Sequence, residues 1–162
     1  MRIPVRYLPP SLSTKDKKKQ LQMLLKSRKL YKRHNYFTRK RLPSYKTKTS
    51  KHITRAKKIY NVDTIIPSKE LSRKTGCSLE VLKKIVNKGE GAYFSSGSRP
   101  NQTAHSWGYA RLGSAITGQK AAAVDFSIIE TSCSKSGKAY KLALKAKKKY
   151  GSGHYATRKT SV

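Results

Sequence analysis

Residues able to carry acid–base or nucleophilic chemistry are few in this sequence and lie far apart. The four histidines are dispersed along the chain: His34, His52, His105 and His154. His105 and Ser106 are direct neighbours, and side chains one position apart on a helix do not face each other. Only Asp125 and Glu130 could supply carboxylates near the helix predicted around that pair. The sequence therefore predicts a protein that is not an enzyme.

The two cysteines form no recognisable metal or disulfide motif. Cys77 and Cys133 lie far apart, without a CxxC pair and without a histidine at ligand spacing. Structural zinc sites need four ligands in closely spaced pairs, and disulfide frameworks are typical of cysteine-rich secreted chains. We therefore expect two small, buried and reduced cysteines, no bound metal and no cofactor.

The segment Arg28–Arg41, RKLYKRHNYFTRKR, interleaves basic and aromatic side chains. Lys and Arg neutralise phosphates, and aromatic rings stack on bases or fill protein pockets. We predict that nucleic acid contacts ten residues of this segment: Arg28, Lys29, Tyr31, Lys32, Arg33, Tyr36, Phe37, Arg39, Lys40 and Arg41. Because phosphate contacts carry no sequence information, the predicted binding is largely independent of base sequence. The alternative is a solvated basic linker.

A second candidate is a helix-turn-helix in residues 70–89, ELSRKTGCSLEVLKKIVNKG. Gly76 stands at the turn, where glycine allows two helices to cross closely. A second helix that reads a DNA groove would expose Lys83 and Lys84, which are the predicted contacts, together with Ser78, Glu80 and Asn87. The alternative is a plain helical corner in a small core.

The turn SSGSRPNQT, Ser95–Thr103, is an anion-binding candidate because it precedes a predicted helix. Backbone N–H groups at a helix start hold phosphate or carboxylate groups, and Ser98 and Arg99 would add side-chain donors. No Gly-Lys-Ser/Thr follows, so the turn is not a P-loop. The alternative is a structural turn in which Arg99 pairs with a nearby acid such as Glu90 or Asp125.

Caps and apolar periodicity predict a mostly α fold. We expect helices over about 14–31, after Ser50 to Tyr60, over 69–75, from Ser78 to a stop at Gly89, over 103–117 and over 137–150. Residues 32–52 should be extended, and residues 121–130 predict a short strand or a helical start. In the 103–117 helix, Gly108 and Gly113 should let another backbone approach closely, and we expect Trp107 in the core.

Charge divides the chain into three parts. The 162 residues hold 38 Lys and Arg against seven Asp and Glu, a net charge of +31, with +19 in residues 1–60, +3 in 61–134 and +9 in 135–162. This predicts a basic N-terminal arm with an amphipathic helix, a compact α-rich domain, and a basic C-terminal helix and tail. Further predicted nucleic-acid contacts are Lys147, Lys148 and Lys149. No apolar run is long enough to span a bilayer, so we expect no membrane span.

The stretch Gly76–Asp125 resembles an uncharacterised domain in proteins of large double-stranded DNA viruses of algae and amoebae and of tailed phages. The resemblance covers about 50 of the 162 residues and rests on the motif KGxGAxxSSGSRPNQTAxSWGxARLxSAxTG, which begins at Lys88 and ends at Gly118. It implies a viral context and virion association. It brings no established activity, and therefore no catalytic residue.

Taken together, these observations predict a structural virion protein, either a minor capsid protein or a component of the inner side of the capsid. It would belong to a large assembly and bind other capsid proteins, packaged DNA or both through its basic arms. Two alternatives remain open at this point: a helix-turn-helix DNA-binding protein, and a ribosomal protein ordered on rRNA.

Overall fold

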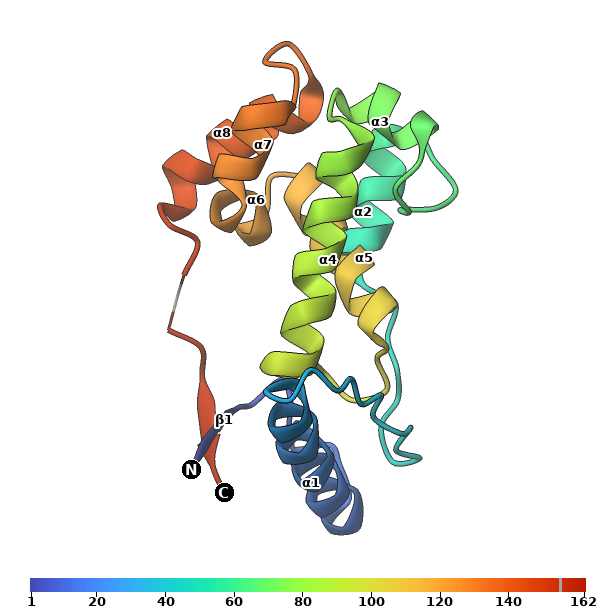
Figure 1. Cartoon of the computed structure of the whole chain (residues 1–162), viewed down its shortest axis with the longest axis vertical. Helices are drawn as coiled ribbons and strands as arrows, with labels where there is room; N and C mark the ends of the chain where they lie inside the picture. Colours follow the sequence, from blue (N-terminus) through green and yellow to red (C-terminus); the bar gives the residue numbers. More distant parts are fainter. Residues whose placement is uncertain (155) are drawn as a thin grey trace. The chain divides into compact units, whose positions relative to one another are not determined.

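The computed structural model describes residues 1–154 and 156–162, and its fold is mostly helical, as predicted. The elements in chain order are β1 (Arg2–Pro4), α1 (Thr14–Tyr31), α2 (Lys51–Tyr60), α3 (Lys69–Thr75), α4 (Leu79–Ser95), α5 (Ala104–Ile116), α6 (Lys120–Val124), α7 (Phe126–Ser132), α8 (Lys138–Tyr150) and β2 (Lys159–Ser161) (Figure 1). No helix within the described residues is long and apolar enough to cross a bilayer.

Local capping explains most of the helix boundaries. The Ser13 hydroxyl accepts a hydrogen bond from the Asp16 N–H at the start of α1, and Ser68 does the same for Leu71 at the start of α3. Gly76 ends α3 in the left-handed conformation, with φ at 79°. A serine side chain at a helix start accepts a hydrogen bond from a backbone N–H that has no partner within the helix. Glycine adopts the left-handed conformation that ends many helices without steric cost.

One predicted helix boundary is wrong, and the structure decides one alternative that the sequence left open. The helix that starts after Ser78 does not stop at Gly89 but continues to Ser95. Gly89 remains helical because its missing side chain lets α4 approach α5: a Cβ at Gly89 would lie 2.6 Å from the Gly108 Cα. Residues 121–130 contain no strand and instead form most of α6 and α7, which meet at Asp125. The alanines of this stretch are strong helix formers.

The chain forms two compact units that do not follow its charge segments. Unit 1 contains residues 1–48, 90–107 and 156–162, and unit 2 contains residues 49–89 and 108–154 of the described chain. The basic N-terminal segment packs with the 90–107 segment inside unit 1, where β1 also pairs antiparallel with β2. Much of the segment predicted as an arm is therefore part of a folded unit.

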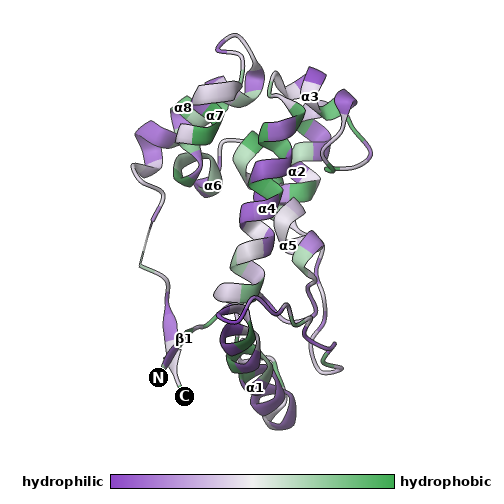
Figure 2. Ribbon diagram, in the orientation of Figure 1, coloured by the Kyte–Doolittle hydropathy of each residue, from purple (hydrophilic) through white to green (hydrophobic). Residues whose placement is uncertain are grey.

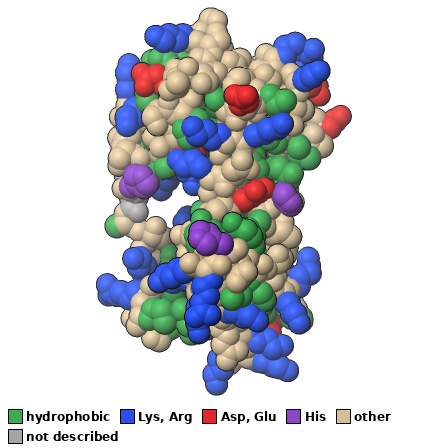
Figure 3. Space-filling model, in the orientation of Figure 1, with side chains coloured by type: hydrophobic (Ala, Val, Ile, Leu, Met, Phe, Trp, Pro, Cys, Tyr) green, Lys and Arg blue, Asp and Glu red, His purple; other side chains and the backbone are tan. Residues whose placement is uncertain are grey.

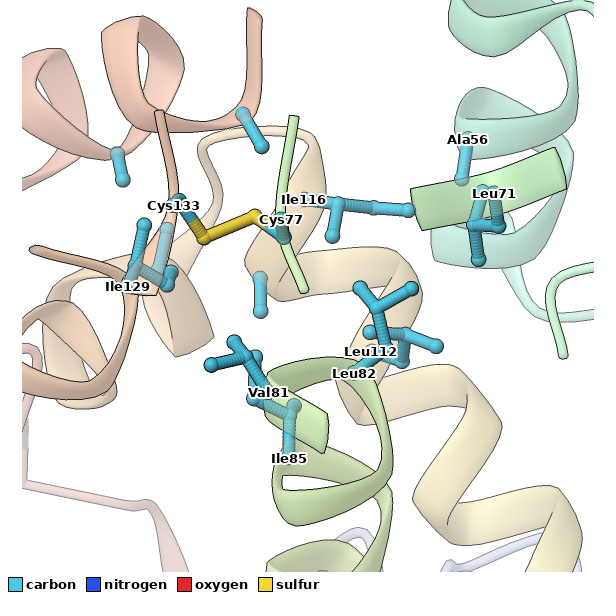
Figure 4. Close-up of a cluster of buried hydrophobic side chains, with 14 of the residues drawn as sticks. Ala56, Leu71, Cys77, Val81, Leu82, Ile85, Leu112, Ile116, Ile129 and Cys133 are labelled. Atoms are coloured by element: carbon cyan, nitrogen blue, oxygen red, sulfur yellow. A yellow bond between two sulfur atoms is a disulfide. The ribbon is translucent and has the colours of Figure 1, made fainter. Parts of the chain in front are cut away.

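Unit 2 has a hydrophobic core to which α2–α8 all contribute. Its fully buried side chains include Leu71 of α3, Leu82 and Ile85 of α4, and Leu112 and Ile116 of α5 (Figure 4). The alanines Ala139, Ala143 and Ala146 line the buried face of α8. The close approach expected for α5 is confirmed, because Gly108 lies against Gly89 and a Cβ at Gly113 would lie 2.9 Å from the His52 carbonyl oxygen.

Unit 1 has a smaller apolar cluster, made of Ile3, Tyr7, Leu8 and Leu24. Trp107 is half-buried and packs on this cluster, with its ring edge against Tyr7 at 6.3 Å between centroids. Helix α1 is mostly hydrophilic (Figure 2), and its buried positions include the polar residues Asp16, Gln20 and Ser27. Because so little apolar surface is available, polar contacts must hold much of this unit together.

The expectation of two reduced cysteines is wrong, because Cys77 and Cys133 form a disulfide in unit 2 (Figure 4). The turn after α3 and the end of α7 run side by side as an antiparallel bridge. The Ser134 N–H donates to the Gly76 carbonyl at 2.8 Å and the Ser78 N–H donates to the Ser132 carbonyl at 3.3 Å. The two cysteines are 56 positions apart in sequence, so their spacing alone did not indicate a disulfide.

Candidate nucleic-acid interface

Residues 36–47, which we call the strap, have no regular secondary structure but are fastened at several points to the rest of unit 1. The Arg39 N–H donates to the Tyr93 hydroxyl at 2.9 Å, and the Leu42 N–H donates to the Asn101 Oδ1 at 2.7 Å. Further along, the Ser44 N–H and hydroxyl both donate to the Asp16 carboxylate. The predicted extended segment is thus a fixed part of the surface and not a free linker.

Arg39 was predicted to contact nucleic acid, and its burial corrects that prediction. Only 7% of the residue is exposed. Its Nη1 donates to the Ser27 hydroxyl at 3.1 Å and to the Tyr93 carbonyl at 2.9 Å, and its Nη2 donates to the Ser98 hydroxyl at 2.8 Å. The guanidinium also lies 3.7 Å from the centroid of the Tyr93 ring. Burial lowers the pKa of Arg39, and these neutral acceptors and the ring hold its charge in place.

The Ser98–Arg99 turn is structural, so the anion-binding prediction for Ser98 is wrong. Ser98 is fully buried, and its hydroxyl is occupied by Arg39 and by the Arg99 carbonyl. Asn101, in the left-handed region at φ 62°, uses its side-chain amide to hold Leu42 and Tyr45 of the strap.

Arg99 itself is exposed on this turn. The alternative in which it pairs with an acid is not observed either, because both proposed acids have other partners. Glu90 contacts His105 at 2.7 Å, and Asp125 binds Lys88 and Arg111. The exposed Arg99 therefore adds one more cation to the surface of unit 1.

The three predicted aromatic contacts have different surroundings. Tyr36 is 66% exposed, with its ring centroid 5.1 Å from that of Phe94 and 6.1 Å from that of Tyr31. Phe37 is half-buried, and the Lys26 ammonium lies 4.6 Å from its ring centroid. Tyr31 is half-buried as well. Of these three rings, only Tyr36 presents most of its surface to solvent.

The basic residues of the segment Arg28–Arg41 also differ in how exposed they are. Arg28 is half-buried and donates from Nε and Nη2 to the Ser96 carbonyl at 2.9 and 2.7 Å, so two of its nitrogens already serve the fold. The remaining predicted contacts of the segment are all exposed: Lys29, Lys32, Arg33, Lys40 and Arg41. Unit 1 as a whole contains 19 Lys and Arg against two acids, Asp16 and Glu90, a net charge of +17.

The predicted contacts in unit 2 are exposed on two helices. Lys83 and Lys84 lie on α4, and Lys147, Lys148 and Lys149 lie on the last turn of α8. Lys84 also lines a polar pocket of about 340 Å³ together with Ser78 and Glu80 of the α4 start and residues of α7. Unit 2 carries 19 Lys and Arg against five acids, a net charge of +14. Figure 3 shows basic side chains over both units on the face drawn.

Two of the seven acids, Asp16 and Asp125, are buried and hydrogen-bonded, whereas Asp63, Glu70, Glu80 and Glu130 are exposed. Hydrogen bonds from Ser44 hold the pKa of Asp16 below its ordinary value. Burial opposes ionisation of Asp125, but the hydrogen bonds from Arg111 at 2.9 and 2.8 Å and from Lys88 at 2.7 Å outweigh it and lower its pKa. Ion pairs join Lys74 to Glu70, and both Lys88 and Arg111 to Asp125, but seven acids cannot pair with 38 Lys and Arg. Most of the positive charge therefore has no acidic partner within the described chain.

Sequence reasoning missed the residues that shape this surface. Ser27, Tyr93 and Asn101 position the strap, yet each is an ordinary polar or aromatic residue in its own segment. Asn101 offered a weak signal, since asparagine is among the few residues that adopt the left-handed conformation readily. Within the described residues, no group of three His, Cys, Asp or Glu side chains is arranged to hold a metal ion.

Comparison with known proteins identifies a family but no described activity. Residues 4–131 match the family model "Family of unknown function (DUF5824)", which spans most of the chain and ends within α7. No curated protein and no solved structure matches the chain.

Proposed function

The chain belongs to the DUF5824 family, and we propose that it is a structural virion protein that binds nucleic acid through its basic surface. In this role it is a minor capsid protein or a component of the inner side of the capsid, in contact with packaged nucleic acid and with neighbouring capsid proteins. The observation that carries the proposal is the net positive charge of both units, +17 and +14, which the seven acids of the chain cannot neutralise.

Electrostatics favours a polyanion as the partner. A net charge of about 2–8 is enough to keep a small domain soluble, so +31 needs another explanation. Charges of one sign at this density repel one another and oppose the compact state. A phosphate backbone removes that repulsion and releases its own condensed counterions on binding. Packing such a protein against a genome therefore stabilises both partners.

The virion context of the proposal rests on the resemblance of Gly76–Asp125 to a domain of large DNA viruses and tailed phages. Mass spectrometry of virions and ribosomes purified from the same infected cells tests it. We expect the protein in virions at a fixed ratio to the capsid proteins. Recovery only with ribosomes would support the ribosomal alternative and contradict the virion assignment.

The helix-turn-helix alternative has some geometric support, because α3 and α4 flank a left-handed Gly76 and Lys83 and Asn87 are exposed. Against it, the exposed Ser78, Glu80 and Lys84 line a pocket together with residues of α7, so α7 flanks the helix face that a groove reader would place against DNA. Selection from random duplexes separates the two functions. We expect no enriched site, and enrichment of a defined site would favour the groove reader.

A further inference from the structure

Tyr36 is the feature of unit 1 that the phosphate-binding function does not use. A single exposed aromatic is common on protein surfaces, but this ring packs against two other rings. Phe94 and Tyr31 lie 5.1 and 6.1 Å away between centroids, and Phe94 in turn packs edge-on against the buried Tyr93 at 5.0 Å. Tyr36 is therefore packed against other rings while 66% of the residue remains exposed to solvent.

The backbone next to Tyr36 is fixed as well. Three residues further on, the Arg39 N–H is bound by the Tyr93 hydroxyl and the Arg39 side chain is bound by Ser27, Tyr93 and Ser98. The ring therefore loses little conformational freedom when a ligand covers it. Preorganisation of this kind raises affinity, because less entropy is lost on binding.

The charges around Tyr36 indicate which ligand the ring suits. Lys32 and Arg33 precede it, Lys40 and Arg41 follow it, and all four side chains are exposed. The sequence contains no Asp or Glu between Asp16 and Asp63. An aromatic platform with cations before and after it fits a chain that carries both phosphates and flat bases. A protein partner would need a strongly acidic face to approach the same surface.

Duplex nucleic acid does not offer that combination. Its bases are stacked on each other and present only their edges in the grooves, so a protein ring reaches a base face without the cost of unstacking the duplex only where the strand is unpaired. We propose that Tyr36 is a stacking contact for unpaired bases, and that unit 1 therefore binds single-stranded nucleic acid more tightly than phosphate contacts alone allow. This inference rests on the proposed nucleic-acid binding and names the kind of strand that unit 1 prefers.

Three ligands with the same number of phosphates separate stacking from charge: oligothymidylate of about 16 nucleotides, an abasic strand of that length, and a short duplex. We expect Y36A to weaken binding to oligothymidylate by roughly 5- to 150-fold, the range found when a stacking ring is replaced by alanine. The same variant should bind the abasic strand and the duplex as the wild type does. Y36W should retain the affinity, because it keeps a planar face.

Two controls keep the result interpretable. K40A should weaken all three ligands to a similar extent, because it removes only a phosphate contact. Y36L keeps an apolar side chain against Phe94 but has no planar face, so it should lose most of the oligothymidylate affinity while melting like the wild type. Ultraviolet cross-linking to oligothymidylate, followed by peptide mapping, should place the adduct on Tyr36.

The outcomes also separate this inference from the proposed function. Equal binding of oligothymidylate by Y36A and the wild type would overturn the stacking role, as would an equal loss of affinity for the abasic strand. If Y36A instead changed only self-association in sedimentation, the ring would be a protein contact and the inference would be wrong. If the wild type bound none of the three ligands, the nucleic-acid function itself would fail.

Discussion

Arg39 and Arg41 lie two positions apart and have opposite surroundings. The Arg39 side chain is buried and donates to Ser27, Tyr93 and Ser98, whereas Arg41 is exposed. A composition-based reading treats the two alike, because both are cations in one basic run. The difference comes from Ser98, which lies 59 positions away in sequence and supplies an acceptor that only the folded chain provides.

This pair of arginines gives a matched test. R39K keeps the charge but loses the planar fork, leaving buried acceptors without donors, so we expect it to lower the free energy of unfolding by about 3 kcal/mol. R41A should leave stability unchanged and reduce the salt slope of nucleic-acid binding by about one. Chemical denaturation and binding titrations measure the two effects. A stable R39K together with a destabilised R41A would reverse the assignment.

Asp125 gives unit 2 a dependence on pH. The carboxylate is fully buried, and Arg111 and Lys88 hold its pKa below the ordinary value. A carboxyl whose pKa is lower in the folded chain adds stability that is fully present above the unfolded pKa, about 3.9. That stability is lost as the pH falls from there through the folded pKa. Asp16, whose pKa is also lowered, adds a second contribution of the same sign in unit 1.

We therefore expect D125N to lower the free energy of unfolding by about 3 kcal/mol at neutral pH, since it leaves two cations without their buried partner. The estimate is at the low end of the usual range because Lys88 and Arg111 are partly exposed. Below about pH 4 the variant and the wild type should converge. E130Q, at an exposed position, is the control. A constant gap between D125N and the wild type down to pH 2 would contradict this account.

Helices α4 and α5 approach each other at Gly89 and Gly108, and neither glycine is explained by its own helix. Glycine inside a helix costs about 1 kcal/mol relative to alanine. At Gly89 this cost is offset by the close contact, since a Cβ there would lie 2.6 Å from the Gly108 Cα and 3.2 Å from the Arg111 Cβ. Gly91 lies in the same helix, and a Cβ there would have the Tyr31 hydroxyl as its nearest neighbour, at 3.9 Å.

Two alanine variants should therefore shift stability in opposite directions. G89A forces backbone apart and should cost about 1–3 kcal/mol. G91A fills open space in a helix and should gain up to about 1 kcal/mol. Thermal melting of both variants against the wild type measures the signs. Equal shifts for both would mean that the close approach of α4 and α5 is not what requires glycine at position 89.

The sequence predicted elements better than the contacts between them. Ser13, Ser68, Gly76 and Gly151 mark helix ends through interactions within a few residues, and the predicted ends agree with the structure. The predictions failed where a distant segment decides the outcome. Gly89 was predicted to end a helix, because its contact with Gly108 cannot be seen in the local sequence. Cys77 was predicted to be a free thiol, because its disulfide partner Cys133 is distant in sequence.

Contacts between distant segments also decided which parts of the candidate site could be predicted. The exposed cations on the strap and on α8 were predictable, since a lysine or arginine without a nearby acid is usually solvated. The sequence did not predict which of the aromatic and basic residues would be buried. Arg39 and Ser98 are both buried and are hydrogen-bonded to each other. The Lys26 ammonium lies near the ring of Phe37, whereas Tyr36 stays exposed although it packs against Phe94.

One physical property of the whole molecule underlies the proposed function: a large excess of positive charge over acids, distributed over two folded units. It predicts contact with a phosphate backbone that is insensitive to base sequence and sensitive to salt. Neither the mostly helical fold nor membership of the family explains this excess of positive charge. It follows from the small number of acids, seven against 38 Lys and Arg.

The salt dependence of binding to a duplex of arbitrary sequence tests this claim most directly. If the protein neutralises about eight phosphates, its affinity should fall by roughly 10⁴-fold between 50 and 200 mM salt. Duplexes of different sequence should give the same slope. An affinity that does not change with salt would contradict the claim, because the partner would then not be a nucleic acid backbone.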